Sequence, residues 1–137
     1  MNYIITKHPE FFHKIGKYNF CDLEDMILPE TLAVDTETTG LFPRDCDIFC
    51  IQIGTGKNNY LIHMYDDNYF VKDAIPYLEN KTLVFQNALF DLGFFYKYGF
   101  YPDKIKDTML ATKILLNGKD YMDSKADFQS IMKRELN

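Results

Sequence analysis

Two carboxylates stand two residues apart in the stretch LAVDTETTGL, residues 32–41. Asp35 and Glu37 follow the apolar run TLAV, and residues i and i+2 of a β-strand point to the same face. Two like charges held this close repel each other unless a cation lies between them. The pair is therefore either a metal site or two solvated charges at a strand end, or else Asp35 caps a turn. Its place at the end of a buried strand, where sites of α/β sheets gather, favours the metal site.

A third carboxylate lies in the stretch VFQNALFDLGFF. Asn87 and Asp91 are four residues apart, so they share one face of the helix predicted here. Apolar residues stand on both sides of Asp91, which is unusual for a surface charge, although an exposed position on a polar stripe remains the alternative. Three carboxylates without a histidine or cysteine partner suit hard divalent ions, Mg²⁺ or Mn²⁺ rather than Zn²⁺.

The elements that position these residues can be predicted from the pattern of apolar residues. NYIIT, LPETLAVDTE and KTLVFQ have strand character, and DIFCIQIGTG and NNYLIHM form a hairpin around the turn residues Gly54 to Asn59. PEFFHKIGKYNFCDLEDMI is predicted as an imperfect helix, and NYFVKDAIPYLEN as a helix that Pro76 kinks. This order of elements predicts an α/β or α+β sheet with helices packed over it.

Three further helices are predicted from their capping residues. NALFDLGFFYKYG is capped by Asn87 or one of its neighbours and closed by Gly99. DTMLATKILLNG begins at Asp107 and stops at Gly118. DSKADFQSIMKREL begins with the capping-box pattern Ser124-x-x-Asp127. Its apolar stripe needs a partner surface, and it consists of Phe128, Ile131, Met132 and Leu136.

Length and composition fit one domain, residues 1–137, with 47% hydrophobic and 26% charged residues. The net charge of −5 argues against a protein that simply coats nucleic acid. No apolar run reaches the ~20 residues of a membrane span, and the N-terminus does not resemble a secretory signal. Cys21, Cys46 and Cys50 fit neither a disulfide framework nor a zinc pattern. We therefore expect a cytoplasmic protein with no membrane contact.

DTETTGL and QNALFD resemble the first two motifs of the 3′–5′ exonucleases of the DEDD class, which have a ribonuclease H-like fold. The resemblance is strongest to the proofreading domain of bacterial and phage DNA polymerase I, with ribonuclease D a near relative. KDTMLATKILLNG and DYMDSKADFQSIMKREL also resemble that branch. The resemblance implies a mixed sheet of three antiparallel strands, then helix-strand-helix, in a bacterium or phage-infected host.

The resemblance also implies a role for each carboxylate. Asp35 would bridge two divalent ions, Mg²⁺ or Mn²⁺, and Glu37 would bind the ion that activates water. Asp91 would hold the second ion, on the leaving-group side. The implied reaction is two-metal phosphodiester hydrolysis that removes nucleoside 5′-monophosphates from single-stranded DNA 3′ ends.

Three residues would hold the substrate according to the same resemblance. Thr38 and Leu41 would hold the terminal nucleotide, with Leu41 wedged against its base. Asn87 would steady the DNA near the third carboxylate.

The family's fourth carboxylate belongs to a Tyr-x-x-x-Asp or His-x-x-x-Asp motif on a later helix. The sequence contains this pattern three times, always before Asp91 and therefore in the wrong order, at Tyr18/Asp22, His63/Asp67 and Tyr69/Asp73. We thus expect a C-terminally incomplete domain without that helix. The chain could be half of a split enzyme completed by a second polypeptide, a truncated chain, or an inactive module that binds nucleic acid or a partner. Exposed apolar surface would also allow self-association.

Overall fold

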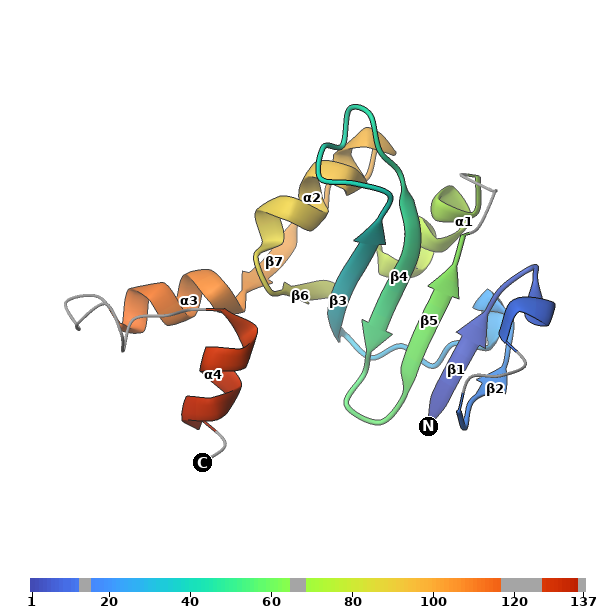
Figure 1. Ribbon diagram of the computed structural model, residues 1–137, viewed down its shortest axis with the longest axis horizontal. Helices are drawn as coiled ribbons and strands as arrows, with labels where there is room; N and C mark the ends of the chain where they lie inside the picture. The colour runs from blue at the N-terminus through green and yellow to red at the C-terminus, as the bar shows by residue number, and fades with distance from the viewer. Residues whose placement is uncertain (13–15, 65–68, 117–126, 136–137) are drawn as a thin grey trace.

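The computed structural model describes residues 1–12, 16–64, 69–116 and 127–135, and the backbone forms one mixed sheet of seven strands (Figure 1). The order across the sheet is β2-β1-β5-β4-β3-β6-β7. The strands are β1 (Asn2–Ile5), β2 (Asn19–Phe20), β3 (Thr31–Thr38), β4 (Ile48–Gly54), β5 (Asn59–His63), β6 (Thr82–Phe85) and β7 (Lys104–Asp107).

Four α-helices and two short 3₁₀ helices complete the described structure. They are α1 (Tyr69–Leu78), α2 (Ala88–Lys97), α3 (Thr108–Leu115) and α4 (Phe128–Glu135), with 3₁₀ helices at Pro9–Phe12 and Leu23–Asp25. No helix within the described ranges is both long and apolar enough to span a membrane.

The strand connections confirm the predicted mixed α/β sheet. β3, β4 and β5 run antiparallel, with the β4–β5 hairpin turning through Gly56 at φ +79°. From β5 the chain passes through α1 to β6, which pairs parallel with β3, and through α2 to β7, which pairs parallel with β6. Parallel neighbours need such helical crossovers, which place α1 and α2 against one face of the sheet.

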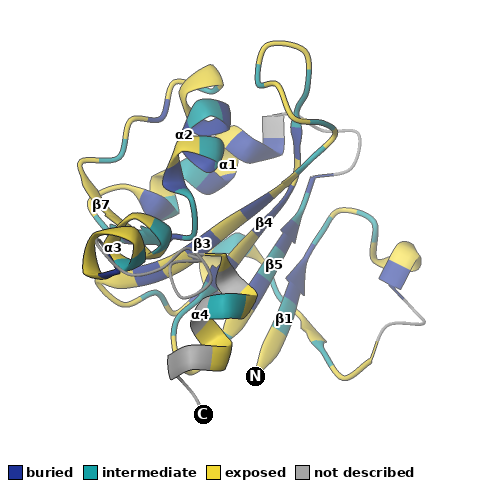
Figure 2. Ribbon diagram, turned by 60° about the vertical axis from the view of Figure 1, so that its left-hand side comes forward, coloured by how far each residue is buried: buried dark blue, intermediate teal, exposed yellow. Residues whose placement is uncertain are grey.

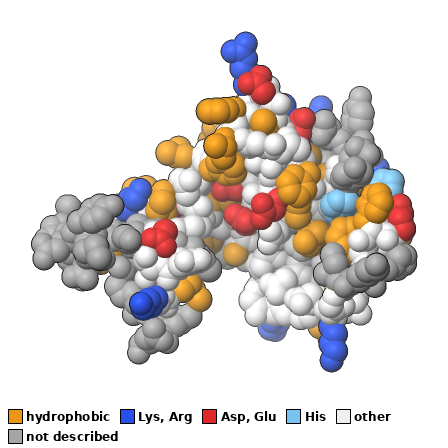
Figure 3. Space-filling view, in the orientation of Figure 1, with side chains coloured by type: hydrophobic (Ala, Val, Ile, Leu, Met, Phe, Trp, Pro, Cys, Tyr) orange, Lys and Arg blue, Asp and Glu red, His pale blue; other side chains and the backbone are white. Residues whose placement is uncertain are grey.

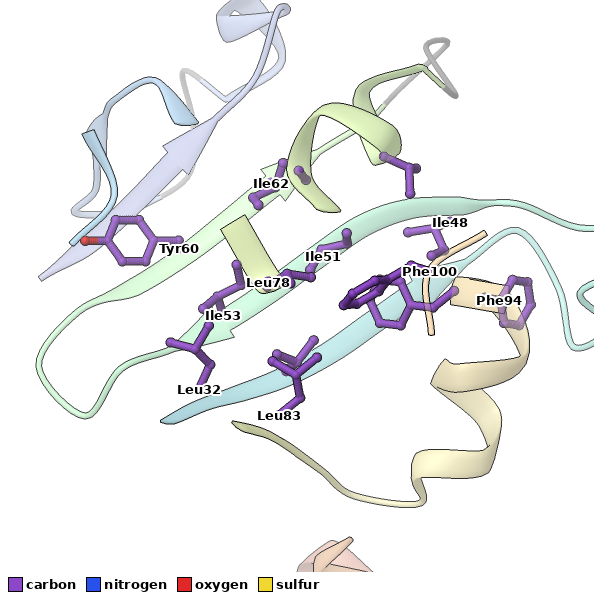
Figure 4. Packing of buried hydrophobic residues seen from close by; sticks show 14 of the residues in the cluster. Leu32, Ile48, Ile51, Ile53, Tyr60, Ile62, Leu78, Leu83, Phe94 and Phe100 are labelled. Atoms are coloured by element: carbon purple, nitrogen blue, oxygen red, sulfur yellow. The ribbon is translucent and has the colours of Figure 1, made fainter. Parts of the chain in front are cut away.

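Alternation along β3 shows how the two faces of the sheet differ. Leu32, Val34 and Thr36 are buried, whereas Asp35 and Glu37 are exposed and, by the alternation of a strand, belong to the opposite face. Figure 2 shows buried and exposed residues on the ribbon of β3. The buried face packs against α1 and α2 in one apolar core, with isoleucines of β4 and β5 turned toward Leu78, Phe94 and Phe100 in Figure 4. The acidic pair therefore lies on the face that these two helices leave open.

The helix predicted over PEFFHKIGKYNFCDLEDMI is wrong. The described part of this segment holds two 3₁₀ helices and the edge strand β2, which pairs parallel with β1. Pairing with the free edge of β1 thus outweighs a weak helical pattern. The Tyr18 hydroxyl donates a hydrogen bond to the Phe12 carbonyl.

Other boundaries also differ from the prediction. The strand β7 was not predicted, and the proposed stop at Gly118 and cap at Ser124 lie outside the described residues. α4 begins after Asp127, whose carboxylate accepts a hydrogen bond from the Ser130 N–H at 2.9 Å. Only Met132 of the predicted apolar stripe has a described side chain, and it is exposed.

Asp107 joins the N-termini of two helices. Its Oδ1 accepts the N–H groups of Met109 at 2.9 Å and Leu110 at 3.1 Å, which confirms the predicted cap of α3. The same carboxylate accepts the Asn87 N–H at 3.2 Å and the Ala88 N–H at 2.9 Å, at the start of α2. Partial burial alone would raise the pKa of Asp107, but these N–H donors lower it below its ordinary value.

Replacing Asp107 by alanine should lower the free energy of unfolding by about 2 kcal/mol, because two helices lose their N-terminal acceptor at once. Chemical denaturation monitored by circular dichroism measures this change. Asp103→Ala is the matched control, since Asp103 is an exposed residue just before β7. Equal stability of the two variants would contradict the double-cap interpretation.

Candidate active site

Asp35 and Glu37 lie together on the open face near the end of β3. Both are exposed, and Figure 3 shows acidic side chains gathered there with hydrophobic side chains around them. Partial burial raises the pKa of Asp35, and the neighbouring charge of Glu37 raises it further. The structure thus contains the predicted pair of repelling carboxylates on one face.

The strand β4 pairs with β3 next to the two acids. Asp35 lies opposite Gln52 and Glu37 opposite Cys50, and the register then shifts, since Thr38 lies opposite Ile48. This β-bulge ends regular pairing directly after Glu37, where bulges commonly redirect a side chain.

Cys50 is buried beside the acidic pair. Burial, with added repulsion from Glu37 and Asp35, raises the pKa of Cys50 to about 12. The thiol is therefore protonated at neutral pH in the metal-free protein.

Asp91 points into the protein toward β3. Its Oδ1 accepts the backbone N–H of Thr36 at 3.0 Å and the Thr36 hydroxyl at 2.6 Å. Burial raises the pKa of Asp91 to about 6; the two Thr36 hydrogen bonds lower it, and the charge of Asp35 raises it. The residue is therefore a buried carboxyl within the electrostatic reach of Asp35, and not the exposed helix charge considered as the alternative.

The three predicted metal ligands do not form one ready-made set. Within the described residues, no group of three or more His, Cys, Asp and Glu side chains is close enough to hold a metal ion. Asp35 and Glu37 offer exposed carboxylate oxygens on one face, which fit a hard divalent ion. Asp91 is on the buried side of β3, bound to Thr36, so its part in a metal site stays a prediction.

The loop after β3 carries the predicted nucleotide-holding residues. The Thr38 hydroxyl donates to the Gly40 carbonyl at 2.7 Å, so it shapes the start of this loop. A Cβ at position 40 would lie 2.5 Å from the Cys46 Sγ, so a larger residue there would require the Cys46 side chain to move. The Leu41 side chain is 73% exposed and is therefore available for contact with a ligand.

Asp47 anchors the far end of the same loop. Its Oδ1 accepts hydrogen bonds from the Lys97 Nζ at 2.6 Å and the Tyr98 hydroxyl at 3.0 Å, at the C-terminal end of α2. Its backbone carbonyl accepts the Thr39 N–H at 2.9 Å. Residues 39–47 are thus fixed to α2, the helix that carries Asp91.

Asn87 lies at the predicted position before α2, but not in the predicted capping role. Its backbone has the left-handed conformation, with φ 68°, and its side chain makes no capping hydrogen bond. Asp107 supplies the acceptor instead. The Asn87 side chain is therefore not needed to cap the helix.

Three residues of this region were not predicted as part of the site. Thr36 lies between Asp35 and Glu37 in the sequence, and its hydroxyl, a possible hydrogen-bond donor on the buried face of the strand, was not used in the prediction. Gln52 was detectable as a polar residue inside the apolar run CIQI, and Asp107 was recognised for only one of its two helices.

Tyr18 and His63 belong to the repeated Tyr/His-x-x-x-Asp pattern, and both lie outside β3 and α2, the elements that carry the predicted acids. Tyr18 precedes β2 and bonds to the Phe12 carbonyl, and the His63 Nδ1 lies 3.1 Å from the Thr6 hydroxyl. β2 is at one edge of the sheet, and β1, β5 and β4 separate it from β3. Tyr18 lines the same hollow of the open face as Asp35, although β2, the strand that follows it, is not adjacent to β3.

The raised pKa of Asp91 predicts a pH-dependent loss of stability in the metal-free protein. The native carboxyl retains its proton up to about pH 6, whereas the ordinary pKa is 3.8. The higher proton affinity of the native carboxyl stabilises the folded state relative to the unfolded chain. This contribution to the free energy of unfolding is fully present below pH 3.8 and is lost as the pH rises through 6. The two-unit difference corresponds to about 3 kcal/mol at pH 7.

Asp91→Asn should therefore stabilise the metal-free protein at pH 7 and not at pH 4, because the amide oxygen can still accept the Thr36 hydrogen bonds. Denaturant unfolding at the two pH values, in chelator, measures the difference. Asp73→Asn, an exposed position on α1, is the control. A variant that is less stable than the native chain at pH 7 would contradict this prediction.

Comparisons with known proteins agree with this fold. A family model described as 3′–5′ exonuclease matches residues 14–137. DNA polymerase I of Aquifex aeolicus is 36% identical over 87 residues, which cover 61% of this chain and 14% of that protein. The matched region is therefore a small part of that polymerase.

Solved structures show the same fold at lower identity. Brucella melitensis NrnC with bound Mg²⁺ has a TM-score of 0.64 at 19% identity, with 98% of this chain and 60% of that chain covered. Escherichia coli RNase D, an exoribonuclease involved in structured RNA processing, has a TM-score of 0.55 at 23% identity, with 77% of this chain and 27% of that chain covered. These likenesses confirm the ribonuclease H-like mixed sheet. The chain belongs to the 3′–5′ exonuclease family of the DEDD class.

Proposed function

We propose that the protein is a metal-dependent 3′–5′ exonuclease that removes nucleoside 5′-monophosphates from single-stranded DNA 3′ ends. The observation that carries the proposal is the pair Asp35 and Glu37, held exposed on one face at the end of β3. Their mutual repulsion destabilises the folded protein, and a divalent cation bound between them would offset it.

Each carboxylate has a proposed role toward two divalent ions, Mg²⁺ or Mn²⁺. Asp35 and Glu37 would hold the ions, and a cation at Asp35 would also lower the pKa of Asp91 and favour its ionised form as the third ligand. Such ions activate a water molecule and stabilise charge on the leaving oxygen. The sheet would position the pair, and the two Thr36 hydrogen bonds would position Asp91.

The loop after β3 and the start of α2 would hold the strand end. Leu41, exposed on its anchored loop, would contact the terminal base, and Thr38 would hold the nucleotide at the loop's start. Asn87, whose side chain has no capping bond, would contact the strand near Asp91.

The family relation to a DNA polymerase I supports DNA as the substrate. RNA is the second candidate, because RNase D, which has the same fold, is an exoribonuclease. The alternative of a non-catalytic binding module stays open for the same chain. The cytoplasmic location inferred from cysteine usage also stays a prediction.

The direct test uses a 5′-labelled single strand incubated with the chain and Mn²⁺, with and without chelator. We expect stepwise shortening from the 3′ end that chelator abolishes, and a loss of at least ~10²-fold in rate for Asp35→Asn. Mn²⁺ should also raise the melting temperature of the native chain but not of this variant.

Matched DNA and RNA strands of one sequence distinguish the two substrate classes in the same assay. Faster shortening of the RNA strand would show that RNA, and not DNA, is the preferred substrate. A strand that binds without shortening, at any Mn²⁺ concentration, would favour the non-catalytic module.

We further propose that a second polypeptide carrying a Tyr-x-x-x-Asp helix, or a second copy, covers part of this protein. α3 supports this proposal, because its large apolar side chains are exposed: Leu110 at 55%, Ile114 at 66% and Leu115 at 80%. Leu110 and Ile114 are four residues apart and share one helix face. Exposed apolar clusters of this kind commonly mark protein contacts.

Light scattering should therefore show association that rises with protein concentration. The double substitution Leu110→Lys with Ile114→Lys should reduce it, whereas Ile27→Lys, at another exposed apolar residue, should not. A monomer at every concentration, with no gain in rate when a Tyr-x-x-x-Asp helical peptide is added, would contradict the proposal.

A further inference from the structure

Gln52 is the polar side chain of β4 that lies beside the acidic pair. The backbone of Gln52 is opposite Asp35 in the β3–β4 register, and Glu37 is the next residue along β3 on the same face. The Gln52 Nε2 donates a hydrogen bond to the Glu37 Oε1 at 3.3 Å. Gln52 therefore lies opposite Asp35 in the register, but its amide bonds diagonally across the two strands to Glu37.

This hydrogen bond is the only one of the Gln52 side chain within the described part of the chain. Gln52 is exposed between the buried residues Ile51 and Ile53, so its side chain contributes no packing to the core. Folding thus does not require an amide at this position. By contrast, another amide of the open face, Asn59, donates to the Asn2 Oδ1 at 3.0 Å and contacts neither acid.

We infer that Gln52 is a positioning residue that holds the Glu37 carboxylate beside Asp35 for divalent-metal binding. The inference rests on the proposed function, because it concerns the metal site of that reaction.

The physical reason is that the two acids repel each other and Glu37 has several rotatable bonds. Without a partner, Glu37 would turn away from Asp35 into solvent, and an incoming ion would have to bring it back. A neutral N–H donor offsets part of the repulsion and limits the rotamers, yet adds no charge that competes with the ion. Partners that hydrogen-bond to metal ligands typically contribute 10- to 100-fold to affinity or activity.

The test is a titration of the full chain with Mn²⁺ alone, followed by electron paramagnetic resonance of the free ion. Gln52→Ala and Gln52→Met should both weaken Mn²⁺ binding by ~10-fold or more. Met keeps the length of the side chain and removes the donor, so it separates hydrogen bonding from side-chain bulk. Asn59→Ala removes an amide from the same face and should bind Mn²⁺ as the native chain does.

Two further measurements separate positioning from a structural effect. Unfolding in chelator should be unchanged in both Gln52 variants, because the amide is not part of the core. In the nuclease assay, a higher Mn²⁺ concentration should restore kcat to within a few-fold of the native value, while Asp35→Asn should stay inactive.

Native Mn²⁺ affinity in both Gln52 variants would overturn this inference and leave the proposed metal site intact, provided that Asp35→Asn weakens binding. Equal weakening in Asn59→Ala would also overturn it, since the effect would then belong to the whole face. A native chain that binds no Mn²⁺ would overturn the proposed metal site and the role of Gln52 together.

Discussion

The buried contact between Asp91 and Thr36 ties α2 to β3, and the position of every predicted site residue depends on these two elements. One carboxylate oxygen accepts both the backbone N–H and the hydroxyl of Thr36, the residue between the two exposed acids. It therefore joins the strand that carries Asp35 to the helix that carries the third carboxylate. Asp107 supplies a second link, because it holds the start of α2 against the start of α3 at the ends of β6 and β7. Displacement of α2 would break both links, so together they hold α2 at a fixed position relative to β3.

The same arrangement is electrostatically unfavourable in the metal-free protein. The pKa values of Asp35 and Asp91 are both raised, chiefly by burial and then by neighbouring carboxylates, and the Cys50 pKa rises for the same reasons. Every shift has the sign that a nearby cation would reverse. Local conflict of this kind is typical of functional sites, where the fold tolerates a loss of stability of a few kcal/mol. The Gln52 amide, a neutral donor beside Glu37, offsets a part of the conflict without removing it.

Short-range patterns in the sequence predicted much of this structure, whereas tertiary pairing determined the rest. The alternation in β3 placed Asp35 and Glu37 on one face correctly, because side chains alternate along any strand. The segment PEFFHKIGKYNFCDLEDMI, residues 9–27, was wrongly predicted as a helix, because the pairing of its strand β2 with β1 is a tertiary contact that the local pattern does not contain. The contacts of Asp107 with α2 span 19 and 20 residues, a separation at which no local pattern identifies a partner. Gln52 could not be assigned to Glu37 before the strand register was known.

The loop after β3 shows how the fold could serve binding as well as catalysis. Its tip exposes Leu41 and Phe42, while its end is fixed by the bonds of Asp47 with Lys97 and Tyr98. Exposed apolar side chains on a free loop would lose conformational entropy when they contact a ligand. On an anchored loop most of that loss has already occurred on folding, so more of the contact energy remains for binding. Because the anchor lies on α2, the same helix sets the distance between these apolar side chains and the Asp91 carboxylate. This coupling supports a site in which a nucleotide base is held at a fixed distance from the carboxylates, as 3′-end hydrolysis requires.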